Sequence, residues 1–181
     1  MSPLPELKLT RAVEADPRRE AIEVFLKKDC RTLWEQSALK IPHVPFLPAL
    51  ETYLKLLLNR RQLERGLEHI DQLLNTEQKG LSAIQEKKGA KPSQRVSRLL
   101  LVTNDGSERF YRACEKTLLR NSDRLLLVYV DESSSRLSEI LLGETNKSIK
   151  ALLVSDRDAV SGVLFSLLGE SLVQSLQSKP L

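Results

Sequence analysis

The chain has 181 residues, of which 41% are hydrophobic and 29% charged, and its formal net charge is +4 at neutral pH. This length and composition exclude two large domains and wholesale disorder, and they favour one core with an appended subdomain. Aromatic residues make up only 4% of the chain, so the core must rest on Leu, Val and Ile, and few rings are available for base stacking.

Several features predict an intracellular protein in a reducing compartment. The first ten residues lack a basic segment followed by an apolar core, and no run of about 18 apolar residues exists, so we expect neither a signal peptide nor a membrane span. Cys30 and Cys114 lie far apart and match no metal-binding spacing. Cys114 falls on the apolar side of a predicted helix, where we expect a buried free thiol.

Residues 1–48 predict an irregular helical N-terminal region. Residues 1–18 hold three prolines without periodicity and predict an extended tail. Asp16-Pro17 is typical of a helix start, and apolar residues between 22 and 34 predict one short amphipathic helix that ends before residue 41. Prolines at 42, 45 and 48 predict a stiff, non-helical linker. Aromatic side chains of this region are candidate anchors for a protein partner: Phe25, Trp34 and Phe46.

Positive charge gathers in the middle of the chain. Apolar periodicity predicts helices over 50–58 and 63–74, with Gly66 as the weak point of the second. The Lys-rich stretch 75–97 predicts a long exposed insertion, functional or disordered. From Lys55 to Arg98, ten Lys and Arg residues stand against five acids. Such clustering is expected of a protein with a phosphate-rich partner, and also of a solvated basic surface.

The last part of the chain alternates apolar runs with helical patterns. The runs are 99–103, 125–130 and 149–154, and the helical patterns are 107–120, 135–142 and 158–168, with Gly143 as a left-handed helix end. Near-continuous apolar strands between helices predict three parallel-type βα units. The fold class is therefore α/β, a three-layer α-β-α sandwich. We expect this domain to span 49–170, followed by a C-terminal tail at 171–181.

Three acids follow the three predicted strands: Asp105, Asp131 and Asp156. Since ligands bind at the carboxyl ends of strands in open α/β sheets, these acids are a candidate Mg²⁺ or phosphate site of a metal-dependent phosphate enzyme. Each acid also precedes a helix, where Asp and Ser cap free N–H groups, and we favour capping. No Gly-rich phosphate loop or nucleophile elbow accompanies them. We therefore expect a non-enzyme, with no cofactor and no small-molecule substrate.

The C-terminal part resembles a known family. Ser107-Glu108-Arg109 opens one helix, and Arg-Leu-Ser-Glu-Ile-Leu-Leu-Gly at 136–143 closes the next unit. Both are similar to features of the kink-turn RNA-binding ribosomal protein family (the L-seven-Ae and L-thirty-e type). Residues 66–74 stand where that family has its RNA-contacting motif, Gly-x-Asn-Glu-x-Thr-x-x-Leu. Matching positions are Gly66, Ile70 and Leu74, whereas the residues that replace Asn, Glu and Thr are Glu68, His69 and Asp71.

The resemblance covers roughly residues 50–168 and implies a small α-β-α sandwich that serves as a non-catalytic RNA scaffold. The long Lys-rich insertion is similar to that of diverged members, the protein subunits of ribonuclease P and ribonuclease MRP, which process tRNA and rRNA. Such a subunit would bind structured RNA and other protein subunits in the nucleus or nucleolus; without this resemblance we expect the cytoplasm. The alternative is a protein–protein adaptor whose α/β domain is purely structural. The residues expected to contact RNA are Arg60, Arg61, Arg65, Glu68, His69, Lys79, Lys87, Lys88 and Arg98.

Overall fold

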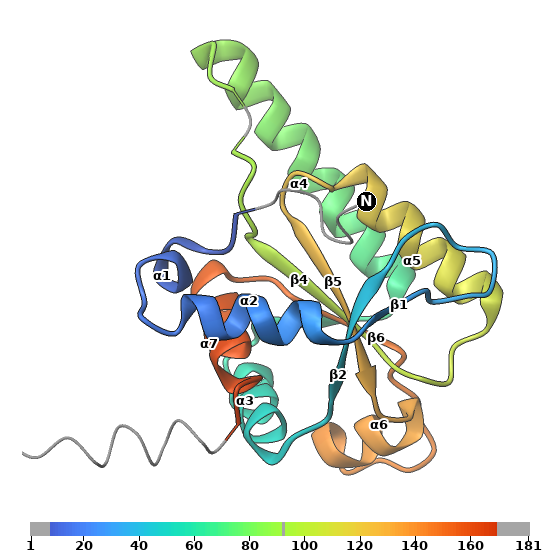
Figure 1. The fold of residues 1–181 in the computed structure, drawn as a ribbon. Helices are drawn as coiled ribbons and strands as arrows, with labels where there is room; N and C mark the ends of the chain where they lie inside the picture. Colours follow the sequence, from blue (N-terminus) through green and yellow to red (C-terminus); the bar gives the residue numbers. More distant parts are fainter. Residues whose placement is uncertain (1–7, 92, 170–181) are drawn as a thin grey trace, which may run out of the picture.

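The computed structural model describes residues 8–91 and 93–169 (Figure 1). Within them, the helices are α1 (Arg11–Glu14), α2 (Arg19–Lys28), α3 (Pro48–Asn59), α4 (Leu67–Lys88), α5 (Glu108–Arg120), α6 (Ser134–Leu142) and α7 (Arg157–Ser166). The strands are β1 (Cys30–Arg31), β2 (Ile41–Pro45), β3 (Leu63–Arg65), β4 (Arg98–Val102), β5 (Leu125–Asp131) and β6 (Ala151–Val154). The predicted tail at 171–181 lies outside the described residues.

The strands form one mixed sheet in the order β1-β2-β5-β4-β6-β3. Strands β2, β5 and β4 run parallel to one another, whereas β6 is antiparallel to both β4 and β3. Side chains of β4 alternate between the two faces: Leu99 and Leu101 join one apolar cluster, and Leu100 and Val102 join the other. Helices α4 and α5 cover the second face, and the remaining helices cover the first. The predicted three-layer α/β sandwich is confirmed.

The direction of β6 corrects the expectation of three parallel units. After α6 the chain turns at Gly143, which has the left-handed φ of +68° expected of it, and runs back along the helix. The Ile149 N–H then donates to the Ser134 carbonyl at 3.0 Å, beside the start of α6. The chain therefore enters the sheet at the end where β5 leaves it, and β6 must run antiparallel to β4. Apolar content indicated burial on both faces but carried no information on direction.

The Pro-rich segment predicted as a linker is a strand of the sheet. Pro42 and Pro45 lie within β2, which pairs with β5 on one side and with the two-residue β1 on the other. A proline removes a backbone donor, and this cost is small next to a sheet edge, where little pairing is lost. β1 and β2 therefore extend the same sheet across the predicted boundary at residue 48.

Two further predictions for the N-terminal region, the extended tail and the end of the amphipathic helix, are corrected. Residues 8–18 are not an extended tail: Leu9 and Val13 are buried, and Lys8 pairs with Arg95 in a parallel bridge. The predicted amphipathic helix is α2, but it ends at Lys28 rather than continuing to Trp34. Residues 1–7 of the predicted tail lie outside the described residues.

Helix α4 corrects the predicted insertion. Gly66 does not weaken a helix; with φ of +82° it makes the tight turn from β3 into α4, a conformation that other residues adopt only under strain. From there α4 continues to Lys88 and ends at the left-handed Gly89. Much of the Lys-rich stretch is therefore the second half of a helix, which extends beyond the sheet (Figure 1). It lacked the apolar periodicity of a helix because only its first half packs on the core, through Ile70 and Leu74.

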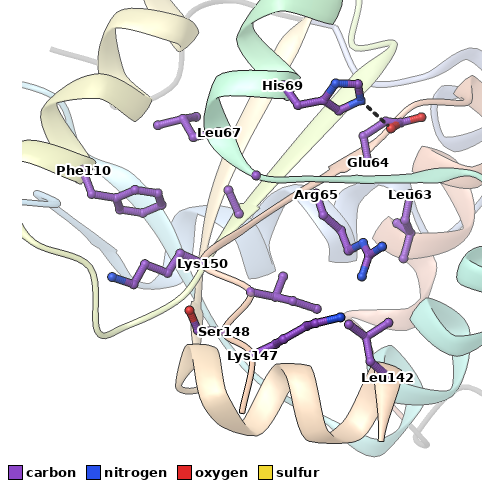
Figure 2. Close-up of a pocket in the computed structure, with 13 residues that line it drawn as sticks. Leu63, Glu64, Arg65, Leu67, His69, Phe110, Leu142, Lys147, Ser148 and Lys150 are labelled. Carbon is purple, nitrogen blue, oxygen red and sulfur yellow. Dashed lines mark hydrogen bonds and ion pairs between the residues drawn. The ribbon is translucent and has the colours of Figure 1, made fainter. Parts of the chain in front are cut away.

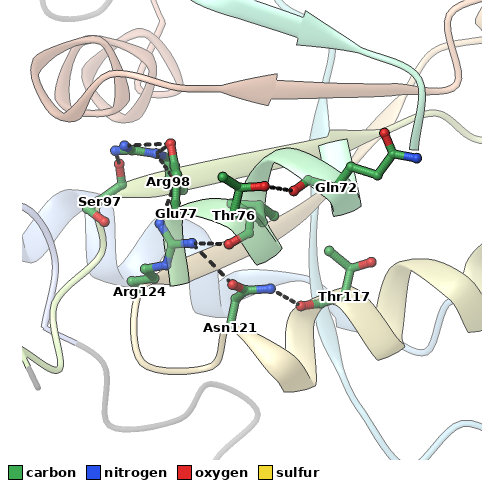
Figure 3. A network of polar contacts seen from close by, with 9 residues as sticks. Gln72, Thr76, Glu77, Ser97, Arg98, Thr117, Asn121 and Arg124 are labelled. Carbon is green, nitrogen blue, oxygen red and sulfur yellow. Dashed lines mark hydrogen bonds and ion pairs between the residues drawn. The ribbon is translucent and has the colours of Figure 1, made fainter. Parts of the chain in front are cut away.

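A partly buried ionic network fixes α4 to the sheet (Figure 3). Glu77 accepts two hydrogen bonds of 3.1 Å from Arg98 on β4 and one of 2.6 Å from Arg124, before β5. Arg124 also donates to the Leu74 carbonyl at 2.9 Å and to Asn121 at 3.3 Å. One carboxylate thus joins a helix to two neighbouring strands.

Of the three acids predicted as caps, only Asp156 caps the helix that follows it, and the caps of α5 and α6 are serines. Ser107, Ser133 and Asp156 accept N-terminal N–H groups of α5, α6 and α7. Cys114 is fully buried with a free thiol, and burial raises its pKa to about 12.

Replacing Glu77 should destabilise the fold. Glu77→Ala leaves the Arg124 guanidinium buried without its carboxylate, and we expect a loss of about 2–3 kcal/mol in the free energy of unfolding. This is less than for a fully buried pair, because the Glu77 side chain is 24% exposed. Urea unfolding measures the loss, and Glu86→Ala, at an exposed position of α4, is the control. Equal stability of the two variants would contradict the network's role.

The same network should appear in the pH dependence of stability. Burial raises the pKa of Glu77, but hydrogen bonds from Arg98 and Arg124 lower it more, so its pKa lies below the ordinary 4.5. Its contribution is therefore complete above pH 4.5 and is lost as the pH falls through the lower pKa of the folded protein. Between pH 5 and pH 3, the native protein should lose more stability than Glu77→Gln in parallel urea titrations. Equal slopes would contradict this.

Candidate nucleic-acid interface

Two depressions lie side by side at the end of the sheet where α4 and α5 begin, and both are lined by Leu67 and Phe110. We call them together the basic groove. The first, of about 700 Å³, lies between the start of α4, the edge of β3 and the loop from α6 to β6 (Figure 2). The second, of about 440 Å³, lies between α4 and α5. The antiparallel direction of β6 creates the first, because it brings residues 147–151 beside the start of α4.

Cations surround the first depression. Arg65 comes from β3, and Lys147 and Lys150 come from the loop before β6, all three with exposed side chains. The acid beside them, Glu64, is paired with His69, with 2.9 Å between Oε2 and Nε2. Lys147 also forms an exposed ion pair with Glu144 at 2.8 Å, a contact that solvent weakens.

The N-terminus of α4 opens on the first depression. Its N-cap residue is Gly66, so no side chain caps the first N–H groups of a 22-residue helix. Free N–H groups and the helix dipole together favour an anion at this point. By contrast, α5 has its own cap, since Ser107 accepts the Phe110 N–H at 3.2 Å. The uncapped helix end and the nearby cations therefore both favour the binding of an anion at this place.

The second depression adds three cations, Arg109, Lys116 and Arg120, and two acids, Glu68 and Asp71. Asp71 is already engaged, because it accepts from Thr117 at 2.9 Å and pairs with Arg120 at 3.3 Å. The whole groove thus has six Lys or Arg residues against three carboxylates, two of which have partners on neighbouring elements.

Phe110 supplies the aromatic ring of the groove, and contacts with Gly106 and Tyr111 hold this ring in place. Its ring lies against Gly106, where an added Cβ would come within 2.5 Å of ring carbon Cδ1. Its neighbour Tyr111 makes an edge contact with the ring, with 5.4 Å between centroids. The Tyr111 hydroxyl donates to the Thr103 carbonyl at 2.6 Å and accepts the Gly106 N–H at 3.0 Å. Burial raises the pKa of Tyr111 to about 12, so it remains a neutral donor.

The residues expected to contact RNA divide into three groups. Arg65, Glu68 and His69 line the groove. Arg98 does not, because it is tied to Glu77. The others are exposed elsewhere, in the turn before β3 or on the second half of α4: Arg60, Arg61, Lys79, Lys87 and Lys88.

The three aromatic anchor candidates make contacts within the chain. The Trp34 indole N–H donates to Glu115 at 2.9 Å, and the Arg112 guanidinium lies 4.3 Å from the ring centroid. Phe25 and Phe46 are half-buried against the core. These contacts account for the three rings as parts of the fold.

The three strand-end acids do not come together. Asp105 and Asp131 share one end of the parallel strands, but Asp156 follows the antiparallel β6 and lies at the other. Asp105 accepts the Ser134 N–H and hydroxyl, at 3.0 and 2.6 Å, so it supports the start of α6. Across residues 8–91 and 93–169 no group of three His, Cys, Asp or Glu residues suits a metal ion. No helix in this part of the chain has the length and apolar character needed to cross a membrane.

The groove residues that the sequence did not single out as contacts are Arg109, Phe110, Lys116, Arg120, Lys147 and Lys150. Lys147 and Lys150 lie on either side of the apolar Ile149, just before a strand. The sequence shows this pattern, but the position of the two lysines in the fold depends on the direction of β6. Lys116 and Arg120 are four residues apart and therefore share one face of α5.

Comparison with known proteins adds no further identification. No protein-family model matches the chain, and no curated protein sequence matches it.

Proposed function

We propose that the protein is a non-catalytic, RNA-binding scaffold subunit of a ribonucleoprotein. The observation that carries the proposal is the basic groove, where a fixed aromatic ring lies among six cations beside the uncapped N-terminus of α4. Phosphates supply most of the affinity in RNA binding, and rings stack on bases. The groove offers both kinds of contact within one surface.

The groove favours structured RNA with few unpaired bases. Phe110 is the only aromatic residue other than His69 among the lining residues of the two depressions, so it can stack one base rather than a run of bases. Glu68, exposed at the rim, can accept a hydrogen bond from a base amino group, while Arg65, Lys147 and Lys150 contact the backbone. A bulge or loop that presents one base beside a closed stem fits this arrangement.

The family resemblance supports the same surface. Residues 66–74, which correspond to the RNA-contacting motif of the kink-turn binders, form the turn and first two turns of α4 that line the groove. We extend the proposal to that family and to a place in ribonuclease P or ribonuclease MRP, with tRNA or rRNA processing in the nucleus. In such an assembly the RNA performs the reaction and this chain holds the RNA and neighbouring protein subunits.

Removing two groove cations should weaken RNA binding and its salt dependence. Lys147→Gln with Lys150→Gln removes up to two phosphate contacts, and the slope of log affinity against log salt should fall by about 1 for each. Binding of the full chain to a bulged hairpin, followed by fluorescence anisotropy across a salt series, measures both quantities.

The matched control is Lys27→Gln with Lys28→Gln, which removes the same charge from exposed positions of α2. It should keep affinity and slope nearly unchanged. A native protein that does not bind the hairpin at low salt, or equal effects of the two double variants, would overturn the proposal.

Replacing Phe110 should weaken binding without changing the salt slope. Phe110→Leu keeps apolar volume but removes the stacking ring, at a cost of about 1–3 kcal/mol, which is roughly 5- to 150-fold in affinity. Phe110→Tyr should keep native affinity. The same anisotropy assay, with thermal unfolding to verify the fold, tests both variants; a Leu variant that binds like the native protein would show that no base stacks there.

A further inference from the structure

A second charged cavity lies at the opposite end of the sheet from the basic groove. It has a volume of about 220 Å³ and lies where β4 and β5 begin and β6 ends, beside Leu81 and Gln85 of α4. We call it the distal cavity. Its charged lining consists of Arg11, Arg95, Arg124, Arg157 and Asp123. An adjoining depression adds Lys8 and Lys91.

One wall of the distal cavity is a buried arginine with an unused donor. Arg124 is only 4% exposed, and its two Nη atoms are held by Glu77 and the Leu74 carbonyl. Its Nε is buried and has no hydrogen-bond partner among the described residues. Buried donors normally have partners, but this guanidinium keeps one unused donor while its positive charge lies beside the cavity.

The remaining cations surround the cavity from separate elements. Arg95 is held in place, because its Nη1 donates to the Leu9 carbonyl at 2.8 Å. Arg11 on α1 and Arg157 on α7 are exposed at the rim. Four arginines face a single carboxylate, Asp123, and one of the four is already paired with Glu77. The excess charge is positive and suits a phosphate, for which the guanidinium fork is well shaped.

We propose that the distal cavity binds a backbone phosphate of the same RNA that the basic groove holds, an inference that rests on the proposed function. Helix α4 connects the two places: Leu67 lines the groove and Leu81 lines the cavity. These residues are fourteen positions apart, which is about 21 Å along a helix. Asp123 favours a ribose phosphate over free inorganic phosphate, because a carboxylate accepts a hydrogen bond from the 2′-hydroxyl.

The test uses two RNAs and one double variant. Both RNAs carry the same bulge, one with a short stem and one with a stem long enough to extend from the groove past the end of α4. Arg11→Gln with Arg157→Gln changes only exposed rim positions, so the fold should be retained, as thermal unfolding verifies. We expect this variant to lose about tenfold in affinity for the long-stem RNA and to bind the short-stem RNA as the native protein does.

Two comparisons separate the inference from the proposed function. Lys147→Gln with Lys150→Gln should lower the affinity for both RNAs, and the α2 control should lower the affinity for neither. If the rim variant binds the long-stem RNA normally, the second contact is overturned while the groove proposal stands. If the native protein binds neither RNA, both proposals fall. If inorganic phosphate stabilises the native protein against unfolding, and the rim variant loses only that effect, the cavity is a site for free anions and the RNA assignment is overturned.

Discussion

The return of the chain along α6 is the constraint on which the rest of the molecule depends. Gly143 reverses the chain, and the Ile149–Ser134 backbone hydrogen bond fixes its position beside the start of the helix. As a result β6 enters the sheet at the end where β5 leaves and pairs antiparallel with β4. This direction places Lys147 and Lys150 beside the N-terminus of α4, and it sends Asp156 to the other end of the sheet. One reversal therefore builds the basic groove and separates the three acids.

The Glu77 network has the complementary role of setting the position of α4. Only the first half of this helix has an apolar face against the sheet, so hydrophobic packing alone leaves its second half without support. Glu77 lies at the transition and binds Arg98 on β4 and Arg124 just before β5. The helix is thereby fixed where it leaves the core, with the groove at its start and the distal cavity beyond the network. The same Arg124 joins the network to the wall of that cavity.

Several carboxylates make contacts within the fold, whereas exposed cations gather at the two ends of the sheet. Glu77, Asp105 and Glu115 each accept hydrogen bonds from neighbouring elements, and Asp156 caps α7. The arginines and lysines of the groove and cavity rim are mostly exposed. A modest formal charge of +4 can therefore produce two local concentrations of positive charge. This distribution is what connects the architecture to a phosphate-rich partner.

The sequence by itself determined the α/β class, most element positions in the last 80 residues, the helix caps and the buried Cys114 thiol. These are local properties, because caps depend on a few adjacent residues and burial depends on apolar content. Tertiary structure decided the direction of β6, the place of β2 in the sheet and the length of α4. Because of Pro42 and Pro45, β2 did not have a strand-like sequence, and its partner β5 lies far away in the chain. The exposed half of α4 has no apolar periodicity from which its length could be predicted. The groove could be foreseen only at Arg65, Glu68 and His69, because its other half comes from α5 and the loop before β6, which only the folded chain brings together.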